Sequence, residues 1–268
     1  MSESTPLISE RPLGELLENS LTSTPCVNVR TKAKVKVVTG MLVQYLESFA
    51  DSVVVREDVT PVGILGGREI IQGVYKNPSS EFFEMNFVED IMDNRLRLVT
   101  ADSTLRELLE AWKSVNRAFA VINVVNDDYS AISAKKILEI GINFETDFHI
   151  SQLPKKKTVT FEKEATIGEV MKLMLENKSR KIVQKDSNLF LNDRTIIEAI
   201  ENFDYLLGRD NFLDIPAKVL NFESAKIVSD DLNLSEISKI LYETSHPLVI
   251  YEESPITRWD VCLALRDL

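Results

Sequence analysis

The sequence predicts an α+β protein made of four β-α-β-β-α repeats, because the same order of elements occurs four times along the chain. Each repeat starts with a short helix-like opener, and the openers recur at intervals of roughly sixty to seventy residues, longer than most solenoid repeats. They occupy residues 13–17, 87–92, 149–154 and 212–216. After each opener the pattern indicates a strand, an amphipathic helix, two strands and a closing helix.

The first long helix of each repeat carries an apolar stripe with the spacing i, i+3, i+4, i+7, which indicates one buried face. The stripes fall at matching offsets, except that Ser238 interrupts the fourth. They consist of Val38, Met41, Leu42 and Tyr45; Leu105, Leu108, Leu109 and Trp112; Ile167, Val170, Met171 and Met174; and Leu234, Ile237 and Leu241. Each stripe alone is a core signature; their common order is what indicates a repeat.

A β-rich run follows each of these helices, at residues 52–55, 118–125, 181–183 and 247–251. One repeat is too small to bury both faces of its sheet, so we expect the repeats to pair. The predicted organisation is a flexible tail at residues 1–12, rich in Ser, Glu and Pro, a first pair at 13–146 and a second pair at 147–268.

Composition excludes several classes of function. The net charge of −11, with acidic and basic residues interspersed, argues against a nucleic-acid surface, which needs a concentrated basic footprint. No run is long and apolar enough to span a bilayer, and the first residues lack the features of a signal peptide. We therefore expect a folded cytoplasmic protein.

Neither a catalytic nor a metal centre is indicated. Cys26 and Cys262 lie in unrelated contexts, and His149 and His246 are the only histidines. There is no recognisable Ser-His-Asp spacing, no cluster of metal ligands and no glycine-rich loop before a lysine. The sequence predicts a protein that is not an enzyme and needs no cofactor.

The most informative stretch is residues 254–261, between an apolar run and a short final helix. Thr257 and Asp260 stand at the step from strand to helix, and two interpretations stay open. Thr257 can cap the helix, with Asp260 favourable in its positive first turn. Alternatively, the hydroxyl and the free helix amides can face a phosphate while the carboxylate accepts bonds from two sugar hydroxyls.

The openers, the stretch 172–180 and residues 63–70 resemble tandem cystathionine beta-synthase-type (CBS) repeats over nearly the whole chain beyond residue 12. The resemblance implies two CBS pairs, or Bateman modules, often stacked as a flat disc, with an adenine nucleotide or adenosyl ligand between the repeats of a pair. Whether a single chain completes the disc or forms a homodimer stays open.

The family's ligand signature is a Gly, two apolar residues, a Ser or Thr, two variable residues and an Asp. The fourth repeat keeps Thr257 and Asp260, with Ser254 in place of the glycine. The first keeps Gly63 but has Glu69 at the carboxylate position, which makes it a possible second site.

The other two corners depart further from the signature. The second repeat has Ser133 but carries Lys136 where the carboxylate belongs, and a lysine cannot accept the sugar's hydrogen bonds. The third repeat offers Asn192 and Thr195, neither of them charged. The contacts that the resemblance implies for the fourth corner are Thr257, Asp260, Arg258, Ile256, Ser179, Arg180, Thr158, Val159 and His246.

The expected function is non-catalytic regulation, including energy sensing: AMP, ADP, ATP or an adenosyl ligand binds between the repeats and changes how the protein contacts a partner. The alternative is a scaffold or adaptor whose ligand corners are degenerate and which acts through protein–protein contacts. An enzyme is a third hypothesis, without a base or metal to support it.

Overall fold

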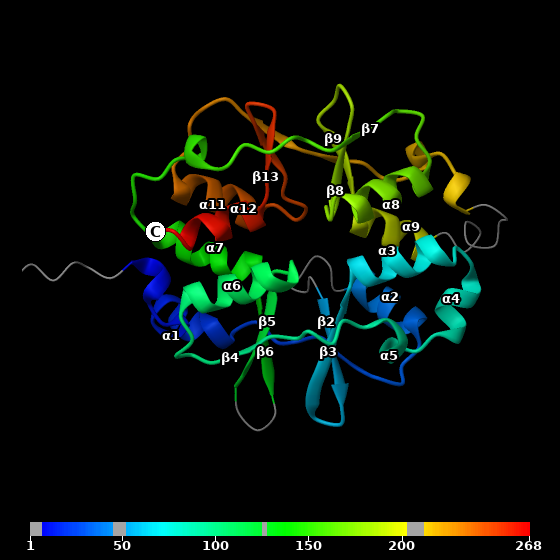
Figure 1. Cartoon of the computed structure of the whole chain (residues 1–268), viewed down its shortest axis with the longest axis horizontal. Coiled ribbons are helices and arrows are strands. Elements are labelled where there is room, and N and C mark those ends of the chain that lie inside the picture. Colours follow the sequence, from blue (N-terminus) through cyan, green and yellow to red (C-terminus); the bar gives the residue numbers. More distant parts are fainter. Residues whose placement is uncertain (1–6, 45–51, 125–127, 203–211) are drawn as a thin grey trace, which may run out of the picture. The chain divides into compact units, whose positions relative to one another are not determined.

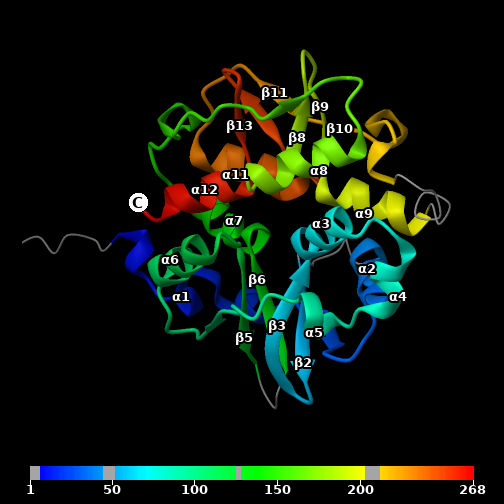
Figure 2. The same ribbon diagram turned by 45° about the vertical axis from the view of Figure 1, so that its right-hand side comes forward.

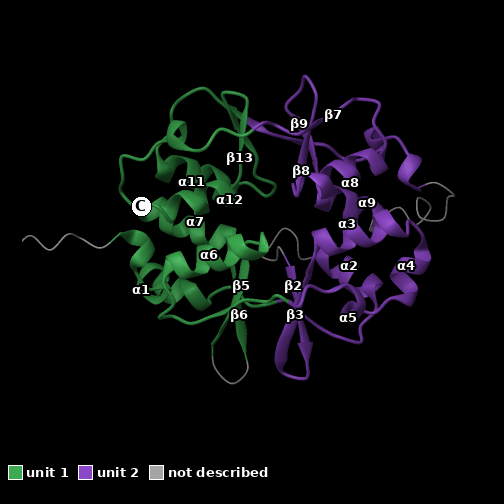
Figure 3. Cartoon of the chain, viewed as in Figure 1, with its two compact units in different colours: residues 1–26, 95–156, 227–268 green, residues 27–94, 157–226 purple. Residues whose placement is uncertain are grey.

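The computed structural model describes residues 7–44, 52–124, 128–202 and 212–268, and there it confirms the predicted α+β class and the repeated order of elements. The chain divides into two compact units, coloured in Figure 3. Unit 1 comprises residues 1–26, 95–156 and 227–268, and unit 2 comprises residues 27–94 and 157–226. Tyr45 and the first six residues of the predicted tail lie outside the described residues.

Unit 2 contains the main parts of the first and third repeats, with sheets in the strand orders β1-β2-β3 and β10-β9-β8-β7 (Figure 1). Its elements are β1 (Asn28–Arg30), α2 (Val35–Gln44), β2 (Ser52–Glu57), β3 (Thr60–Gly66), α3 (Gly67–Lys76), α4 (Ser80–Met85), α5 (Val88–Ile91), β7 (Thr160–Phe161), α8 (Ile167–Glu176), β8 (Lys181–Gln184), β9 (Leu189–Asn192), α9 (Asp193–Asn202), the 3-10 turns η4 (Phe212–Asp214) and η5 (Ala217–Val219), and β10 (Glu223–Ser224).

Unit 1 contains the main parts of the second and fourth repeats, with sheets in the orders β4-β5-β6 and β11-β12-β13. Its elements are η1 (Ile8–Glu10), α1 (Leu13–Leu17), η2 (Glu18–Thr22), β4 (Leu98–Val99), α6 (Leu105–Val115), β5 (Phe119–Asn123), β6 (Tyr129–Ser133), α7 (Ala134–Asn143), η3 (Ile150–Gln152), β11 (Lys226–Val228), α11 (Leu234–Glu243), β12 (Val249–Tyr251), β13 (Ser254–Ile256) and α12 (Arg258–Leu265). Strand β11 begins at the last residue of unit 2.

The sheets share one design, a strand pair joined by a crossover helix followed by an antiparallel hairpin. In the first repeat β1 pairs in parallel with β2 after the crossover helix α2, and β2 then pairs antiparallel with β3 through a tight turn. The turn between β12 and β13 places both Glu252 and Glu253 at positive φ, which is the backbone conformation of a two-residue hairpin.

The openers pack on the neighbouring repeat and not on the one that follows them in sequence. α1 joins the core of the second repeat, and α5 joins the core of the first. Single β-bridges mark the same exchange four times: Pro12 with Thr104, Lys34 with Phe87, His149 with Asn233, and Thr166 with Pro216. The exchange connects the first repeat to the second and the third to the fourth.

Each unit has a core of its own, built by two repeats. The stripe residues Leu105, Leu108 and Trp112 are fully buried in unit 1, where α7 packs on α11 and α12 (Figure 2). In unit 2, α9 packs on α2 and α3. The units therefore combine alternate repeats, whereas the predicted pairs 13–146 and 147–268 join consecutive ones; that pairing stays a prediction.

Three of the four first helices begin with a reciprocal cap. In α6 the Thr104 hydroxyl accepts a bond from the Glu107 amide, and the Glu107 carboxylate accepts one from the Thr104 amide. The same exchange links Thr166 to Glu169 in α8 and Asn233 to Glu236 in α11. This spacing is a known start signal of helices, so the starts are encoded locally.

Residues 7–12, assigned to a flexible tail from their composition, are packed against unit 1. Ile8 is 4% exposed and its amide donates to the carbonyl of Leu268 at 3.0 Å. Arg106 binds Glu10 and Ser9. Within the described part of the chain, every helix is too short or too polar to cross a membrane.

Candidate nucleotide-binding corner

The predicted corner lies in unit 1, where β13 leads into α12. Thr257 precedes the helix with an extended backbone, at φ −122° and ψ 172°. The amide and the hydroxyl of Thr257 each donate to Oδ2 of Asp260, both at 2.8 Å. Asp260 is only 8% exposed. Asp260 therefore caps the amide of Thr257, whereas the Thr257 hydroxyl makes no capping bond to the helix and instead donates to the carboxylate. Together the two bonds orient a buried carboxylate in the first helical turn.

A lysine from the third repeat's opener segment occupies the other oxygen of this carboxylate. The ammonium of Lys156 forms an ion pair with Oδ1 of Asp260. The backbone amide of Lys156 donates to the hydroxyl of Ser254 at 2.9 Å. Ser254 stands where the CBS ligand signature has glycine. The serine thus anchors the segment whose lysine neutralises the corner's carboxylate.

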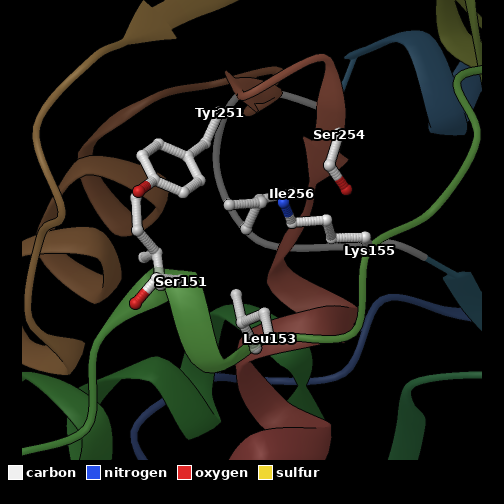
Figure 4. Close-up of a pocket in the computed structure, with 7 residues that line it drawn as sticks. Ser151, Leu153, Lys155, Tyr251, Ser254 and Ile256 are labelled. Carbon is white, nitrogen blue, oxygen red and sulfur yellow. The ribbon is translucent and has the colours of Figure 1, made fainter.

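A small pocket adjoins the corner, within unit 1 (Figure 4). Tyr251, Ser254 and Ile256 line it from the β12–β13 hairpin. The segment around η3 contributes its other lining residues, Ile150, Ser151, Leu153 and Lys155. Ser254 connects the pocket to the corner, because it lines the pocket and its hydroxyl accepts the amide of Lys156, whose ammonium binds Asp260.

The lysine that lines the pocket, Lys155, already forms an ion pair. Lys155 lies 2.8 Å from Glu252, and this hydrogen bond raises the pKa of the lysine. Burial is the main cause that raises the pKa of Tyr251, with the charge of Glu252 adding to it.

Arg258 stabilises a helix end. Its guanidinium donates to the carbonyl of Leu241 at 2.9 Å and to that of Thr244 at 2.8 Å, at the C-terminus of α11. A cation is favourable there because these carbonyls have no partner within the helix. His246 is half-buried between α11 and β12, and Trp259 packs partly against the core of unit 1. Trp112, predicted to be core, is fully buried.

The contacts predicted from the third repeat belong to unit 2. Thr158 and Val159 precede β7, and the Val159 carbonyl accepts a bond from the Val183 amide at 3.1 Å. The Ser179 hydroxyl donates to the Lys181 carbonyl at 2.7 Å. Arg180 donates from Nε to the Asp193 carboxylate at 2.7 Å, and the Asp193 side chain is 4% exposed. Their role toward a ligand stays a prediction.

The possible second site, at Gly63 and Glu69, lies where β3 leads into α3, and its carboxylate is bonded within the same turn. Glu69 is 8% exposed, and its carboxylate accepts the amide of Gly66 at 2.9 Å. A β-carbon at Gly63 would lie 2.8 Å from the sulfur of Met92, so the glycine serves a close approach. Both residues have a structural task in unit 2.

The remaining corners also have internal partners. In the third repeat the Asn192 side chain accepts the amides of Arg194 and Thr195 at 2.8 and 2.9 Å. In the second, Lys136 is 7% exposed and donates to Ser23 and Glu139 at 3.0 and 2.8 Å. The carboxylate of the signature is thus replaced in the second repeat by a buried lysine that pairs with the partly exposed Glu139.

One serine, histidine and aspartate do meet in unit 1, at His149, Ser151 and Asp231. The Ser151 hydroxyl donates to Asp231 at 2.7 Å and its amide donates at 2.9 Å, while His149 contacts the Asp231 carbonyl. The two bonds from Ser151 lower the pKa of Asp231. Because the hydroxyl is directed to the carboxylate, this arrangement differs from an activated nucleophile. The described residues contain no cluster of three or more metal-ligating side chains.

Sequence reasoning missed the partnership of Lys156 with Asp260. Lys156 lies in a run of three lysines at 155–157, a pattern typical of an exposed loop, and Ser254 replaces the glycine of the ligand signature. Neither observation indicates that Lys156 binds Asp260, because these two residues are far apart in sequence.

No family model matches the sequence, and no curated protein matches it significantly. Solved structures do match its fold. A protein from Methanocaldococcus jannaschii, described as a proposed archaeal homologue of g-AMPK, is 13% identical with a TM-score of 0.76, covering 94% of this chain and 99% of that one. An uncharacterized conserved protein from Pyrococcus horikoshii is 12% identical with a TM-score of 0.55, covering 91% and 97%.

CBS-domain proteins match about half of the chain each. One from Agrobacterium tumefaciens is 16% identical with a TM-score of 0.42, and covers 52% of this chain and 98% of that one. The chain has the CBS-domain fold. This likeness concerns the fold, and it agrees with the resemblance carried by the openers and by residues 63–70 and 172–180; Asp260 lies in the fourth repeat.

Proposed function

We propose that the protein is a non-catalytic regulatory module that binds an adenine nucleotide at the corner of its fourth CBS repeat. The observation that carries the proposal is the pair Thr257 and Asp260 at the start of α12: a carboxylate oriented by two hydrogen bonds at the positive N-terminal end of a helix. The carboxylate suits sugar hydroxyls, and the helix amides suit a phosphate.

The similarity to the Methanocaldococcus jannaschii protein supports the choice of adenine nucleotides as first ligands, because that protein is described as a proposed homologue of g-AMPK. In mechanism, the ligand would favour one conformation of the module, and a partner protein would bind the two conformations differently. The ligand can shift that equilibrium only by its difference in affinity for the two states.

The proposal is tested by thermal unfolding with AMP, ADP, ATP, GTP and S-adenosylmethionine, in the wild type and in Asp260→Ala and Asp260→Asn. A ligand at about a hundred times its dissociation constant adds roughly 2.7 kcal/mol, which raises Tm by several degrees in a chain of this size. We expect a shift with adenine ligands that both variants lose.

Asp260→Asn keeps an oxygen for the Thr257 amide, so it separates loss of charge from loss of the cap. Asp267→Ala is the matched control, since Asp267 pairs with its neighbour Arg266 at the chain's end. A ligand-induced shift that survives in Asp260→Asn and Asp260→Ala would place the ligand elsewhere and contradict the proposal.

A second function is favoured by the second corner, where a buried lysine replaces the carboxylate and is already paired with Glu139. A scaffold or adaptor that has lost ligand binding is expected to have corners in which the signature residues are replaced. If no nucleotide shifts Tm while a protein partner co-purifies with the folded chain, the scaffold hypothesis is supported.

A further inference from the structure

We propose that Lys156 determines the specificity of the corner, because it exchanges the Asp260 carboxylate for the phosphate of an incoming ligand and so selects nucleotides over nucleosides. This inference rests on the proposed function. It concerns the contacts of Lys156 with Ser254 and Asp260 within unit 1. We call Lys156, Ser254 and Asp260 the lysine latch.

The first step is the hydrogen-bonding capacity of the carboxylate. Asp260 has roughly four acceptor positions on its two oxygens. Thr257 uses two of them on Oδ2, and the ammonium of Lys156 uses one on Oδ1. A ribose diol donates two hydrogen bonds, and a single position remains. A sugar diol can therefore bind this carboxylate only if one of these donors leaves, and the ammonium on its long, half-exposed side chain is the donor that leaves most easily.

The second step is that the lysine can leave without its backbone moving. The amide of Lys156 stays bonded to the hydroxyl of Ser254, which is 8% exposed and holds the segment against β13. The Lys156 side chain is 46% exposed, so its flexible stem has open space on one side. The released ammonium remains tethered next to the corner.

The third step is that the released charge needs a new partner. An ammonium that loses a buried carboxylate forfeits a charge-assisted bond, which a phosphate can replace and a neutral nucleoside cannot. Other cations nearby are engaged differently: Lys155 is paired with Glu252, and Arg258 binds the end of α11. Lys156 is therefore the cation that loses its own partner, the Asp260 carboxylate, when the sugar of the ligand binds there.

The test measures dissociation constants of adenosine and AMP by calorimetry for the wild type, Lys156→Gln and Lys156→Arg. We expect the wild type to bind AMP at least tenfold more tightly than adenosine. In Lys156→Gln adenosine should bind more tightly and AMP more weakly, so that the AMP preference falls at least tenfold. Lys156→Arg keeps the charge and should keep the preference.

Lys157→Gln is the matched control, since it removes an exposed charge of the same loop that does not line the pocket, and it leaves the latch intact. It should leave the ratio of the two constants within about twofold, because an exposed charge contributes little and is screened by salt. An equal change in Lys157→Gln and Lys156→Gln would overturn the proposal in favour of a general basic surface.

The outcomes separate this inference from the proposed function. If AMP binds the wild type and its preference over adenosine is unchanged in Lys156→Gln, the latch is overturned and the nucleotide site stands. If adenosine binds only Lys156→Gln, the latch is supported as a full block. If neither ligand binds any folded variant, both the site and the latch are overturned.

Discussion

Ser238 of α11 packs directly against Gly141 of α7: a β-carbon at Gly141 would stand 2.4 Å from the Ser238 hydroxyl oxygen. The serine is fully buried, and within the described residues its hydroxyl has no hydrogen-bond partner. This contact explains why the apolar stripe of the fourth repeat is interrupted at this position. A leucine or isoleucine here would hold the two helices apart.

Gly141→Ala is expected to destabilise the protein by about 1–3 kcal/mol, because the added methyl group overpacks the contact of α7 with α11. This loss should exceed the gain of about 1 kcal/mol that alanine brings to a helix interior. Ser238→Ala removes a buried unpaired hydroxyl and should be neutral or slightly stabilising. Urea denaturation measures both effects.

The double variant Gly141→Ala/Ser238→Ala tests the cause. Removing the hydroxyl oxygen relieves the shortest contact, so the double variant should be more stable than Gly141→Ala alone. Additive effects of the two substitutions would show that the loss arises elsewhere.

Arg258→Ala is expected to lower the free energy of unfolding by about 1–3 kcal/mol without any ligand, because two carbonyls at the end of α11 lose a charged donor. Arg266→Ala is the control: Arg266 pairs with the adjacent Asp267, and its removal should change stability by less than about 0.5 kcal/mol. Equal losses in the two variants would argue against a structural role for Arg258.

Asp231 should make the protein more stable above pH 3.8 than below it. Hydrogen bonds from Ser151 hold the pKa of the folded carboxyl below its ordinary value of 3.8. The stabilisation is therefore present above 3.8 and is lost as pH falls through the lower folded pKa. The stability difference between wild type and Asp231→Asn, measured in urea, should shrink in acid.

Ser151→Ala tests the cause of that pH dependence, because it removes the largest contribution to the lowered pKa. Its difference from the wild type should shrink over the same acidic range. A difference that stays constant with pH would mean that the serine does not act through the titration of Asp231.

The two thiols should differ in reactivity. Burial raises the pKa of Cys262 far above its ordinary value of 9.0, and its sulfur lies 3.6 Å from the carbonyl of Ala134. Cys26 is partly exposed. Since the thiolate is the reactive form, native protein should be alkylated at Cys26 alone, as mass spectrometry will show. Rapid labelling of the native Cys26→Ser variant would contradict this expectation.

Local patterns predicted much of the fold correctly. The stripe of α6 is buried at Leu105, Leu108, Leu109 and Trp112, and the run at 181–183 became β8. The step from strand to helix at Thr257 was also predicted. These features follow from hydrophobic periods of 3.6 and 2 residues and from end signals within one turn, all of which depend on neighbours in sequence.

Partner choice could not be predicted in this way. Nothing near Pro12 specifies its bridge to Thr104, so the exchange of openers between repeats became visible only in the folded chain. The same holds for Lys156 and Asp260, which form an ion pair although they are far apart in sequence. The sequence by itself determined the repeats, their helices and strands, and the corner at Thr257 and Asp260. Only the tertiary structure decided which repeats share a core and which cation meets that carboxylate, because burial and charge pairing depend on distances in space between residues far apart in the chain.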